Sequence, residues 1–488
     1  MNRTLAVMIV ALTALGIAVP TRADLQADLA VVLQDKLLTK AAVGIEIAEL
    51  GPEPADDRVL YTRAAQSPLM PASNMKVLTT SAALALLGPD FRFRTYLVQR
   101  GDDLVLVGDG DPSFGDAELL KKAGWDATTV FQNWAQQLSK AAIVRFRDVL
   151  VDDSVFDETF VHPDWPPEQE QSRYMAQAAG MSLNANCIDF YLQPNGPGRV
   201  VTYRTDPPTS FVKVQNTCVS GGANAVWLSR QRGGNQITLR GTCPARSEGP
   251  ISVTIHDPPM YAATVLAETL AAGGIRIDGK VARDRTVRAT LIQGQLEPGI
   301  TVLAAHETPL ALVITRANKD SMNLYAECLL KRVGFAATGQ SGSWDNGAAA
   351  LHAFLKKLGL PPEECRVADG CGLSRQNALS AHAIIQVLSY DFHSKHRMAF
   401  INSLAVGGED GTLDSRFKQP DLRGKVLAKT GYIANVSALS GYLRISDDQW
   451  YAFSILMNGL PAGQNARAKS LQDDIVKAIY TNATRKNR

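Results

Sequence analysis

The sequence predicts an α+β fold in which both ends of the chain build one domain of helices packed on an antiparallel sheet. Three observations predict this fold. Residues 425–459 hold three strand-like runs joined by short turns, which is typical of an antiparallel meander. Residues 25–64 combine a helical pattern with two extended runs. Between about 90 and 300, short strands alternate with turns rich in Gly, Pro and Asp, which indicates inserted β-rich material.

The N-terminal part of the chain predicts a helix, a hairpin and a second helix. An amphipathic pattern covers residues 25–39, and the extended runs 41–50 and 58–64 are divided by the turn-rich "GPEPADD". In "LMPASNMKVLTT", Pro71 and Ser73 are signals for the start of a helix. Apolar positions then continue the helix until a Gly-Pro pair ends it.

The C-terminal part predicts the remainder of the same sheet. The three strand-like runs cover residues 425–433, 437–446 and 450–459. A closing helix is predicted over residues 466–482, "ARAKSLQDDIVKAIYTN". Because this strand and helix content matches that of the N-terminal part, we expect the first and last thirds of the chain to form one unit.

The first 23 residues have the features of a secretory signal peptide. A short basic start precedes an apolar run, and Thr21 and Ala23 occupy the −3 and −1 positions of a cut before Asp24. A single membrane anchor is the alternative, but the apolar run is shorter than the roughly 20 residues that a spanning helix needs. We therefore expect export to the periplasm or cell envelope, with no membrane-spanning segment in the mature chain.

Charge and motifs exclude several classes of function. The 488 residues include 50 Lys and Arg against 48 Asp and Glu, and loss of residues 1–23 removes Arg3 and Arg22, which leaves a balanced chain. Such a balance provides no electrostatic footprint for nucleic acid. "GDGDPSFGDAE" lacks the acid spacing and terminal Glu of a calcium-binding EF-hand, so we predict a strand-ending turn there. We expect no metal and no cofactor.

In an exported protein the six cysteines can form disulfides. None lies in a CxxC motif or beside His at metal-ligand spacing, which argues against a metal site. The local pairs Cys218/Cys243 and Cys365/Cys371 are the predicted bridges. Cys328 falls within a helical pattern, and we expect it to be buried.

Ser73 and Lys76 are the first candidates for chemistry. At positions i and i+3 they lie on one face of a helix, within reach of each other. Free backbone N–H groups and the positive end of the helix dipole also surround a serine at a helix start, which suits a developing oxyanion. Alone this pair is a weak signal, since Ser73 could be only an N-cap.

Two further stretches of sequence complete a known set of three ordered motifs. Ser321 and Asn323 begin a long helical pattern, and Lys429, Thr430 and Gly431 lie on the first strand of the meander. Each has a structural alternative, a helix cap for Ser321 and a β-bulge glycine for Gly431. The ordered set Ser-x-x-Lys, Ser-x-Asn, Lys-Thr-Gly, however, is the signature of penicillin-binding proteins and serine β-lactamases.

The chain resembles one branch of these proteins along nearly its whole mature length. The segment between Lys76 and Ser321 is far longer than a minimal β-lactamase domain needs. With this insertion the chain resembles the class C low-molecular-mass penicillin-binding proteins, the D-alanyl-D-alanine carboxypeptidase/endopeptidase family. The stretches that carry the resemblance are "PASNMK", "GDGDPS", "VDDSVFD", "NLYAECLLKR", "DGCGLSRQN", "GGEDGTL" and "KTGYIANVSALSGYL".

The resemblance implies a penicillin-binding-protein/serine β-lactamase-like domain with two nested β-rich domains. The expected divisions are a signal peptide at 1–23, the catalytic domain at 24–90 and 304–488, inserted domain II at 91–165 and 276–303, and inserted domain III at 166–275.

The resemblance also implies a serine D-Ala-D-Ala carboxypeptidase, with DD-endopeptidase as a second activity, that acts on peptidoglycan peptides and is acylated by β-lactams. Neutral Lys76 would take the proton of Ser73, helped by the like charge of Lys429 and by partial burial. The N–H groups of Ser73 and Tyr432 would hold the oxyanion. The expected catalytic residues are Ser73, Lys76, Ser321 and Asn323, and the expected substrate-binding residues are Lys429, Thr430, Gly431 and Tyr432.

Two departures from the family pattern and two alternative functions remain at this point. Cys371 stands where the family commonly has Ser, and Tyr432 stands where related enzymes often have a small hydroxyl residue, so only its backbone N–H is carried over.

The alternative functions are a β-lactamase or esterase on the same fold and a non-catalytic envelope protein that binds penicillin or peptidoglycan. Arg375 and Asp153 are weaker candidates for peptide contacts, with surface ion pairing as the favoured interpretation for both. The balance of the two peptidase activities and the oligomeric state stay open.

Overall fold

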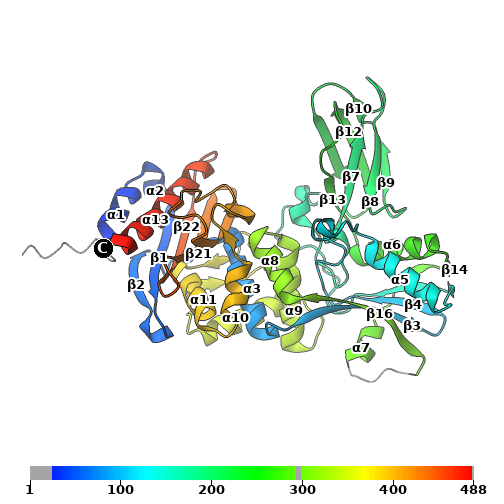
Figure 1. Cartoon of the computed structure of the whole chain (residues 1–488), viewed down its shortest axis with the longest axis horizontal. Coiled ribbons are helices and arrows are strands. Elements are labelled where there is room, and N and C mark those ends of the chain that lie inside the picture. The colour runs from blue at the N-terminus through cyan, green and yellow to red at the C-terminus, as the bar shows by residue number, and fades with distance from the viewer. Residues whose placement is uncertain (1–24, 293–297, 486–488) are drawn as a thin grey trace, which may run out of the picture.

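The computed structural model describes residues 25–292 and 298–485. The predicted signal peptide therefore lies outside the described residues. Within the two described ranges the chain has an α+β fold, as predicted, with one large antiparallel sheet and several smaller sheets (Figure 1). None of the helices described in those ranges is long and apolar enough to cross a membrane.

The large sheet has six strands in the order β19-β20-β21-β22-β1-β2 and joins the two ends of the chain. The hairpin of the N-terminal part adds to the C-terminal meander because β1 pairs with β22 along its full length, from Ala42↔Asn458 to Leu50↔Trp450. The strands are β1 (Ala42–Leu50), β2 (Arg58–Arg63), β19 (Ala405–Val406), β20 (Val426–Ile433), β21 (Val436–Arg444) and β22 (Trp450–Asn458).

Helices cover both faces of this sheet, which explains why its central strands are apolar almost throughout. All nine residues of β22 are buried. Its alternate side chains point to opposite faces, so Leu456 joins one core and Ile455 the other. One core includes α1 (Leu25–Leu33), α2 (Lys36–Lys40) and α13 (Asn465–Arg485); the other includes α3 (Met75–Leu87), α8 (Leu310–Lys319), α9 (Asn323–Thr338), α10 (Trp344–Lys357), α11 (Ala381–His393) and α12 (Arg397–Ser403).

The N-terminal helix differs from its prediction, since the amphipathic pattern over 25–39 is divided into α1 and α2. The Asp35 side chain accepts a hydrogen bond from the backbone N–H of Leu37, so it caps a new helix. The predicted hairpin and the second helix are confirmed, and α3 ends at Leu87.

A five-stranded sheet forms the first part of the inserted region, in the order β15-β6-β4-β3-β16. Helices α5 and α6 pack on one face, and α7 packs on the other. The "GDGDPS" segment follows β4 as a turn, as predicted. The elements are β3 (Arg92–Arg100), β4 (Asp103–Val107), β6 (Val149–Asp152), β15 (Val281–Arg283), β16 (Ile300–Pro309), α5 (Thr129–Lys140), α6 (Pro258–Ala272) and α7 (Val287–Ile292).

Two further sheets form a β-rich lobe that projects from the rest of the molecule (Figure 1). One sheet has the order β13-β7-β8; the other has the order β10-β12-β11, with β9 also paired to β12. The strands are β7 (Cys187–Gln193), β8 (Thr202–Asp206), β9 (Lys213–Asn216), β10 (Val219–Ser220), β11 (Ala225–Arg230), β12 (Gln236–Cys243) and β13 (Ile251–Thr254); short pairs join β5 (Arg145–Phe146) to β14 (Arg276–Ile277) and β17 (Cys365–Arg366) to β18 (Ala378–Leu379).

The inserted region is anchored to the helices beside the large sheet. Asp116, the N-cap of the short helix α4 (Ala117–Leu120), accepts hydrogen bonds from Arg316 of α8, at 2.8 Å, and from the Tyr325 hydroxyl of α9. Phe156 is also buried within the same core as α3 and α9. These contacts matter for function because the segment between α8 and α9 holds Ser321.

The predicted disulfides are wrong for this structure, because all six cysteines are unpaired, buried thiols. Cys365 lies on strand β17, whereas Cys371 is fully buried beside Glu327 and Lys76. Burial first, and then the nearby Cys243, raise the pKa of the Cys218 thiol, and the Cys243 thiol donates a hydrogen bond to the carbonyl of Ala245. The prediction that Cys328 is buried in a helix is confirmed.

Candidate active site

Ser73 and Lys76 come together at the start of α3. Residues Ala72–Asn74 form one turn of 3-10 helix, and α3 continues from Met75. Ala72 has a left-handed backbone, with φ of 46°, which is uncommon for a residue with a side chain. The Lys76 ammonium donates a 2.9 Å hydrogen bond to Ser73 Oγ. The hydroxyl and the amine are therefore placed for direct proton transfer.

Lys76 is completely buried, and three oxygen atoms hold its amine. Besides Ser73 Oγ, they are Asn323 Oδ1 at 2.7 Å and the backbone carbonyl of Cys371 at 3.0 Å. Burial lowers the pKa of Lys76, and the nearby Cys371, Glu327 and Asp369 oppose this by favouring the charged form. A lowered pKa makes the neutral amine available as a base closer to neutral pH.

The Ser321-x-Asn323 segment lies at the junction of α8 and α9. Ser321 has a left-handed backbone, with φ of 57°, and Asn323 is the first residue of α9. The Asn323 amide joins two parts of the chain, because its Oδ1 accepts from Lys76 and its Nδ2 donates to the carbonyl of Tyr174 at 3.0 Å. Tyr174 belongs to the inserted region, which thus contacts the candidate site directly.

Lys429 is a buried residue of β20 and contacts Ser321. Its amine donates 2.8 Å hydrogen bonds to Ser321 Oγ and to the carbonyl of Thr430. Burial and then the charge of Lys76 lower the pKa of Lys429 well below its ordinary value. The repulsion between the two lysines therefore favours the neutral form of Lys429. The Thr430 hydroxyl donates to Thr412 Oγ1 at 2.9 Å, a partner that the sequence did not suggest.

Gly431 is required by close packing, since β20 and β21 pair without a bulge there. A Cβ at Gly431 would lie 2.8 Å from the carbonyl oxygen of Pro71 and 3.0 Å from the Ala438 side chain. The strand therefore runs tightly against the turn that carries Ser73. Ile433 and Val436 close a two-residue hairpin turn, so by the alternation of an antiparallel ladder the Tyr432 N–H points away from β21.

Gly431→Ala tests this packing. We expect the variant to lose about 1–3 kcal/mol of stability, as overpacked sites do, and to react more slowly with penicillin because β20 moves away from the Ser73 turn. Thermal unfolding and the acylation rate measure the two effects. Gly234→Ala is the matched control, because no atom lies within 4 Å of a Cβ added there. Equal effects in both variants would contradict the close-approach explanation.

A cavity of about 480 Å³ lies over these residues. Ser73, Ser321, Asn323 and Tyr432 line it, and the Tyr432 side chain is 57% exposed. Lys76, Lys429, Thr430 and Gly431 are not among its lining residues; Thr430 is half-buried and the other three are buried. No sequence motif marks the other lining residues, because their positions relative to Ser73 depend on the fold. They are Gln169, Tyr174, Gly372, Leu373, Ile433 and Ala434.

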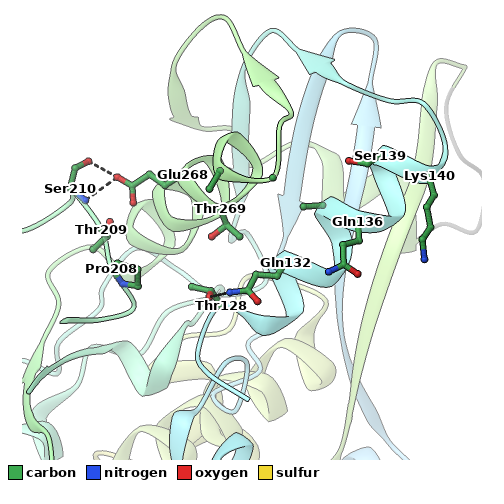
Figure 2. Close-up of a pocket in the computed structure, with 13 residues that line it drawn as sticks. Thr128, Gln132, Gln136, Ser139, Lys140, Pro208, Thr209, Ser210, Glu268 and Thr269 are labelled. Atoms are coloured by element: carbon green, nitrogen blue, oxygen red, sulfur yellow. Dashed lines mark hydrogen bonds between the residues drawn. The ribbon is translucent and has the colours of Figure 1, made fainter. Parts of the chain in front are cut away.

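A larger cavity lies elsewhere and brings no hydroxyl group to a buried lysine amine. It has a volume of about 950 Å³ and lies between α5, α6 and residues 208–210. Figure 2 shows its charged groups on different walls, Glu268 on α6 and Lys140 at the end of α5. The Glu268 carboxylate accepts hydrogen bonds from the N–H and hydroxyl of Ser210. We therefore place the chemistry in the smaller cavity.

The two weaker candidates for peptide contacts differ in position. Asp153 is fully buried, 3.5 Å from Arg283 and 3.8 Å from Arg285, and burial raises its pKa to about 6. Arg375 has no ion pair among the described residues; it donates to the carbonyl of Ala434 at 2.8 Å, at the rim of the 480 Å³ cavity. Asp153 thus forms ion pairs, but in the interior and not at the surface as predicted, and the predicted ion pair of Arg375 is wrong.

Within the described ranges, one group of side chains has metal-ligand chemistry. Potential ligand atoms of Glu327, Asp369 and Cys371 lie within 4.8 Å of one another, and all three residues are buried. Their carboxylates already accept hydrogen bonds, however. Glu327 accepts from the N–H groups of Gly370 and Cys371, and Asp369 accepts from the N–H of Gly372 at 2.7 Å. The group is therefore two carboxyl groups hydrogen-bonded to peptide N–H groups beside Lys76.

Comparisons with known proteins agree on one family. Residues 25–481 match the D-Ala-D-Ala carboxypeptidase 3 (S13) family. The sequence is 30% identical to a D-alanyl-D-alanine carboxypeptidase of an Actinomadura species, over 89% of this chain and 81% of that one. It is 26% identical to the D-alanyl-D-alanine carboxypeptidase DacB of Haemophilus influenzae, over 81% of both chains. The crystal structure of a penicillin binding protein from Haemophilus influenzae superposes with a TM-score of 0.75 and 23% identity, covering 93% of this chain and 99% of that one.

Proposed function

The chain belongs to the D-Ala-D-Ala carboxypeptidase 3 (S13) family and is a serine-type D-Ala-D-Ala carboxypeptidase that acts on peptidoglycan, and we propose that Ser73 is its nucleophile. The observation that carries this proposal is the 2.9 Å hydrogen bond between the Ser73 hydroxyl and the buried amine of Lys76. A serine at its ordinary pKa is a weak nucleophile, and an adjacent neutral amine is one of the groups that activates it.

Acylation would begin with proton transfer from Ser73 to Lys76. Ser73 Oγ then attacks the carbonyl carbon of the penultimate D-alanine, and the new C–O bond forms as the carbonyl π electrons move to its oxygen. The Ser73 and Tyr432 N–H groups are the oxyanion donors in this proposal. The outward direction of the Tyr432 N–H and the tight contact between β20 and the Ser73 turn support it.

When the oxyanion collapses and the carbonyl re-forms, the C–N bond to the terminal D-alanine breaks, and the leaving nitrogen needs a proton. Ser321 would donate that proton and regain one from Lys429, which already donates a hydrogen bond to the Ser321 hydroxyl. Lys429 is fully buried, so its influence on the substrate carboxylate would pass through the Ser321 hydroxyl, to which its amine donates, while the Thr430 hydroxyl would contact that carboxylate itself. The Asn323 amide would hold the peptide. Water then hydrolyses the acyl-enzyme and restores Ser73. In a cross-link, an amine of the neighbouring peptide takes the place of D-alanine as leaving group.

We also propose the domain division of the sequence analysis, with the catalytic domain at 24–90 and 304–488, domain II at 91–165 and 276–303, and domain III at 166–275. Its support is that the six-stranded sheet takes strands from both ends of the chain, whereas the strands of residues 92–309 form other sheets. Strand β16 pairs with β3 as far as Pro309, so the sheet of domain II extends six residues beyond the proposed bound at 303. Export to the periplasm or cell envelope is likewise a proposal, and it is supported by the signal-like residues 1–23. β-Lactams are the proposed inhibitors.

Intact mass spectrometry tests the activity. The protein is incubated separately with penicillin and with a D-Ala-D-Ala pentapeptide. We expect a stable penicillin adduct and loss of one alanine from the pentapeptide. Fast penicillin turnover without peptide cleavage would support a β-lactamase instead, and neither reaction would support a non-catalytic binding protein. Ser210→Ala, a change in the larger cavity, is the control that should leave both reactions unaltered.

A further inference from the structure

Glu327 is a fully buried carboxylate on α9, one turn after Asn323. Its oxygen atoms accept hydrogen bonds from the Cys371 N–H at 2.7 Å, the Gly370 N–H at 3.1 Å and the Trp344 indole N–H at 2.6 Å. Two of these donors belong to one short loop. Glu327 therefore ties the loop to the same helix that carries Asn323.

That loop, residues 369–372, supplies one of the three oxygen atoms around the Lys76 amine. The Cys371 carbonyl accepts from Lys76 at 3.0 Å, and the Gly370 carbonyl accepts from the Thr79 hydroxyl at 2.7 Å. Gly372 has a φ of 87°, and a Cβ there would lie 1.8 Å from the carbonyl oxygen of Ala72. The loop is thus packed directly on the turn that carries Ser73, so its position affects both reacting groups.

Charges around Glu327 couple it to Lys76. Burial first, and then the Asp369 charge, raise the pKa of Glu327 to about 7. In return, the Glu327 and Asp369 charges favour the ammonium form of Lys76. The titratable groups that face Glu327 are Lys76 on α3, Asp369 and the Cys371 thiol on the loop, and Lys331 and the Cys328 thiol on α9. Lys331 also pairs with Asp157, while the His162 ring contacts the edge of Trp344.

We propose that Glu327 is a positioning residue for the general base: it fixes the Cys371 carbonyl that orients Lys76, and its negative charge stabilises the ammonium that Lys76 becomes after taking the proton of Ser73. This inference rests on the proposed function of the Ser73–Lys76 pair. Glu327 would not contact the substrate, yet it would contribute to both the geometry and the electrostatics of acylation.

Glu327→Gln tests the proposal through the second-order rate of penicillin acylation between about pH 5 and pH 9. Glu327 carries its negative charge mainly above about pH 7. Loss of that charge lowers the pKa of Lys76 there, so the part of the acid limb that lies above about pH 7 moves to lower pH. The plateau rate falls by up to about 100-fold, because the glutamine amide faces peptide N–H groups and the Cys371 carbonyl shifts. Glu364→Gln is the matched control, a buried glutamate bound to the Ser380 hydroxyl, and its profile should coincide with wild type.

Two other results would overturn the proposal: an unchanged profile, or a rate reduced by the same factor at every pH with a lowered melting temperature. If Glu327→Gln does not fold, Trp344→Phe supplies the same readout, because it removes one donor that keeps Glu327 ionised; the acid limb should move in the same direction by a smaller amount. Penicillin labelling of the wild-type protein at Ser73 separates a failure of the role proposed for Glu327 from a failure of the proposed Ser73–Lys76 function. If that labelling is present while the profile is unchanged, only the role of Glu327 fails.

Discussion

Ser73→Ala is expected to abolish penicillin labelling and peptide cleavage while leaving the fold intact. The variant removes the only atom proposed to form the covalent bond, so the loss should reach the detection limit of the assays. The cost in stability should be only about 1–2 kcal/mol, because the Ser73 side chain forms no capping hydrogen bond and is one of three oxygen partners of Lys76. Intact mass after penicillin treatment and thermal unfolding measure the two quantities.

The location of the label decides between Ser73 and its neighbours. Ser321 also lines the 480 Å³ cavity and is the other hydroxyl bound to a buried lysine amine. Ser321→Ala should therefore slow acylation and still accumulate the adduct. A penicillin adduct on the Ser73→Ala variant would contradict the nucleophile assignment, and peptide mapping would then identify the residue that carries it.

Lys76→Arg is expected to lower the rate of penicillin acylation by about 100-fold to 10,000-fold, nearly as much as Lys76→Met, because it removes the general base. Arginine keeps the positive charge, but its pKa above about 12 prevents it from being neutral at working pH. In the wild type, burial lowers the pKa of Lys76, and acylation falls as the pH drops through that value and the amine becomes protonated. The variants should lack this acid limb.

The measurement is the second-order acylation rate across pH for wild type and both variants. Lys76 has no exposed surface, so the larger guanidinium needs extra volume, and thermal unfolding must accompany each rate. Lys76→Met keeps a similar length without an amine and serves as the comparison for loss of the base. Acylation by the arginine variant close to the wild-type rate would exclude Lys76 as the base and direct attention to Lys429 or to a bound water.

Several features were predictable because they depend on local patterns. Alternating and continuous apolar runs predicted the meander strands, and the structure gives β20, β21 and β22 within a residue or two of the predicted bounds. The ordered motifs predicted which side chains approach one another. Ser73 and Lys76 share a helix face, a relation that a spacing of three residues specifies.

The wrong predictions concern contacts that short sequence separation does not decide. Cys365 and Cys371 are neighbours in sequence, but the loop that holds Cys371 packs against α3 and α9, so its thiol faces Glu327. The break between α1 and α2 arises because Asp35 caps a new helix, and a hydrophobic pattern does not register that hydrogen bond.

The sequence by itself determined the fold class, the joining of both ends of the chain in one sheet, and the identity of the candidate catalytic residues. These features depend on periodicity and motif spacing, which are encoded residue by residue. Only the tertiary structure decided the surroundings of Lys76. Its partners include the Cys371 backbone carbonyl, and the Tyr174 carbonyl holds Asn323. Every residue carries such a carbonyl, so no residue type marks the ones that serve the site. Burial, which sets the basicity of both lysines, exists only once helices and strands from both ends of the chain have packed together.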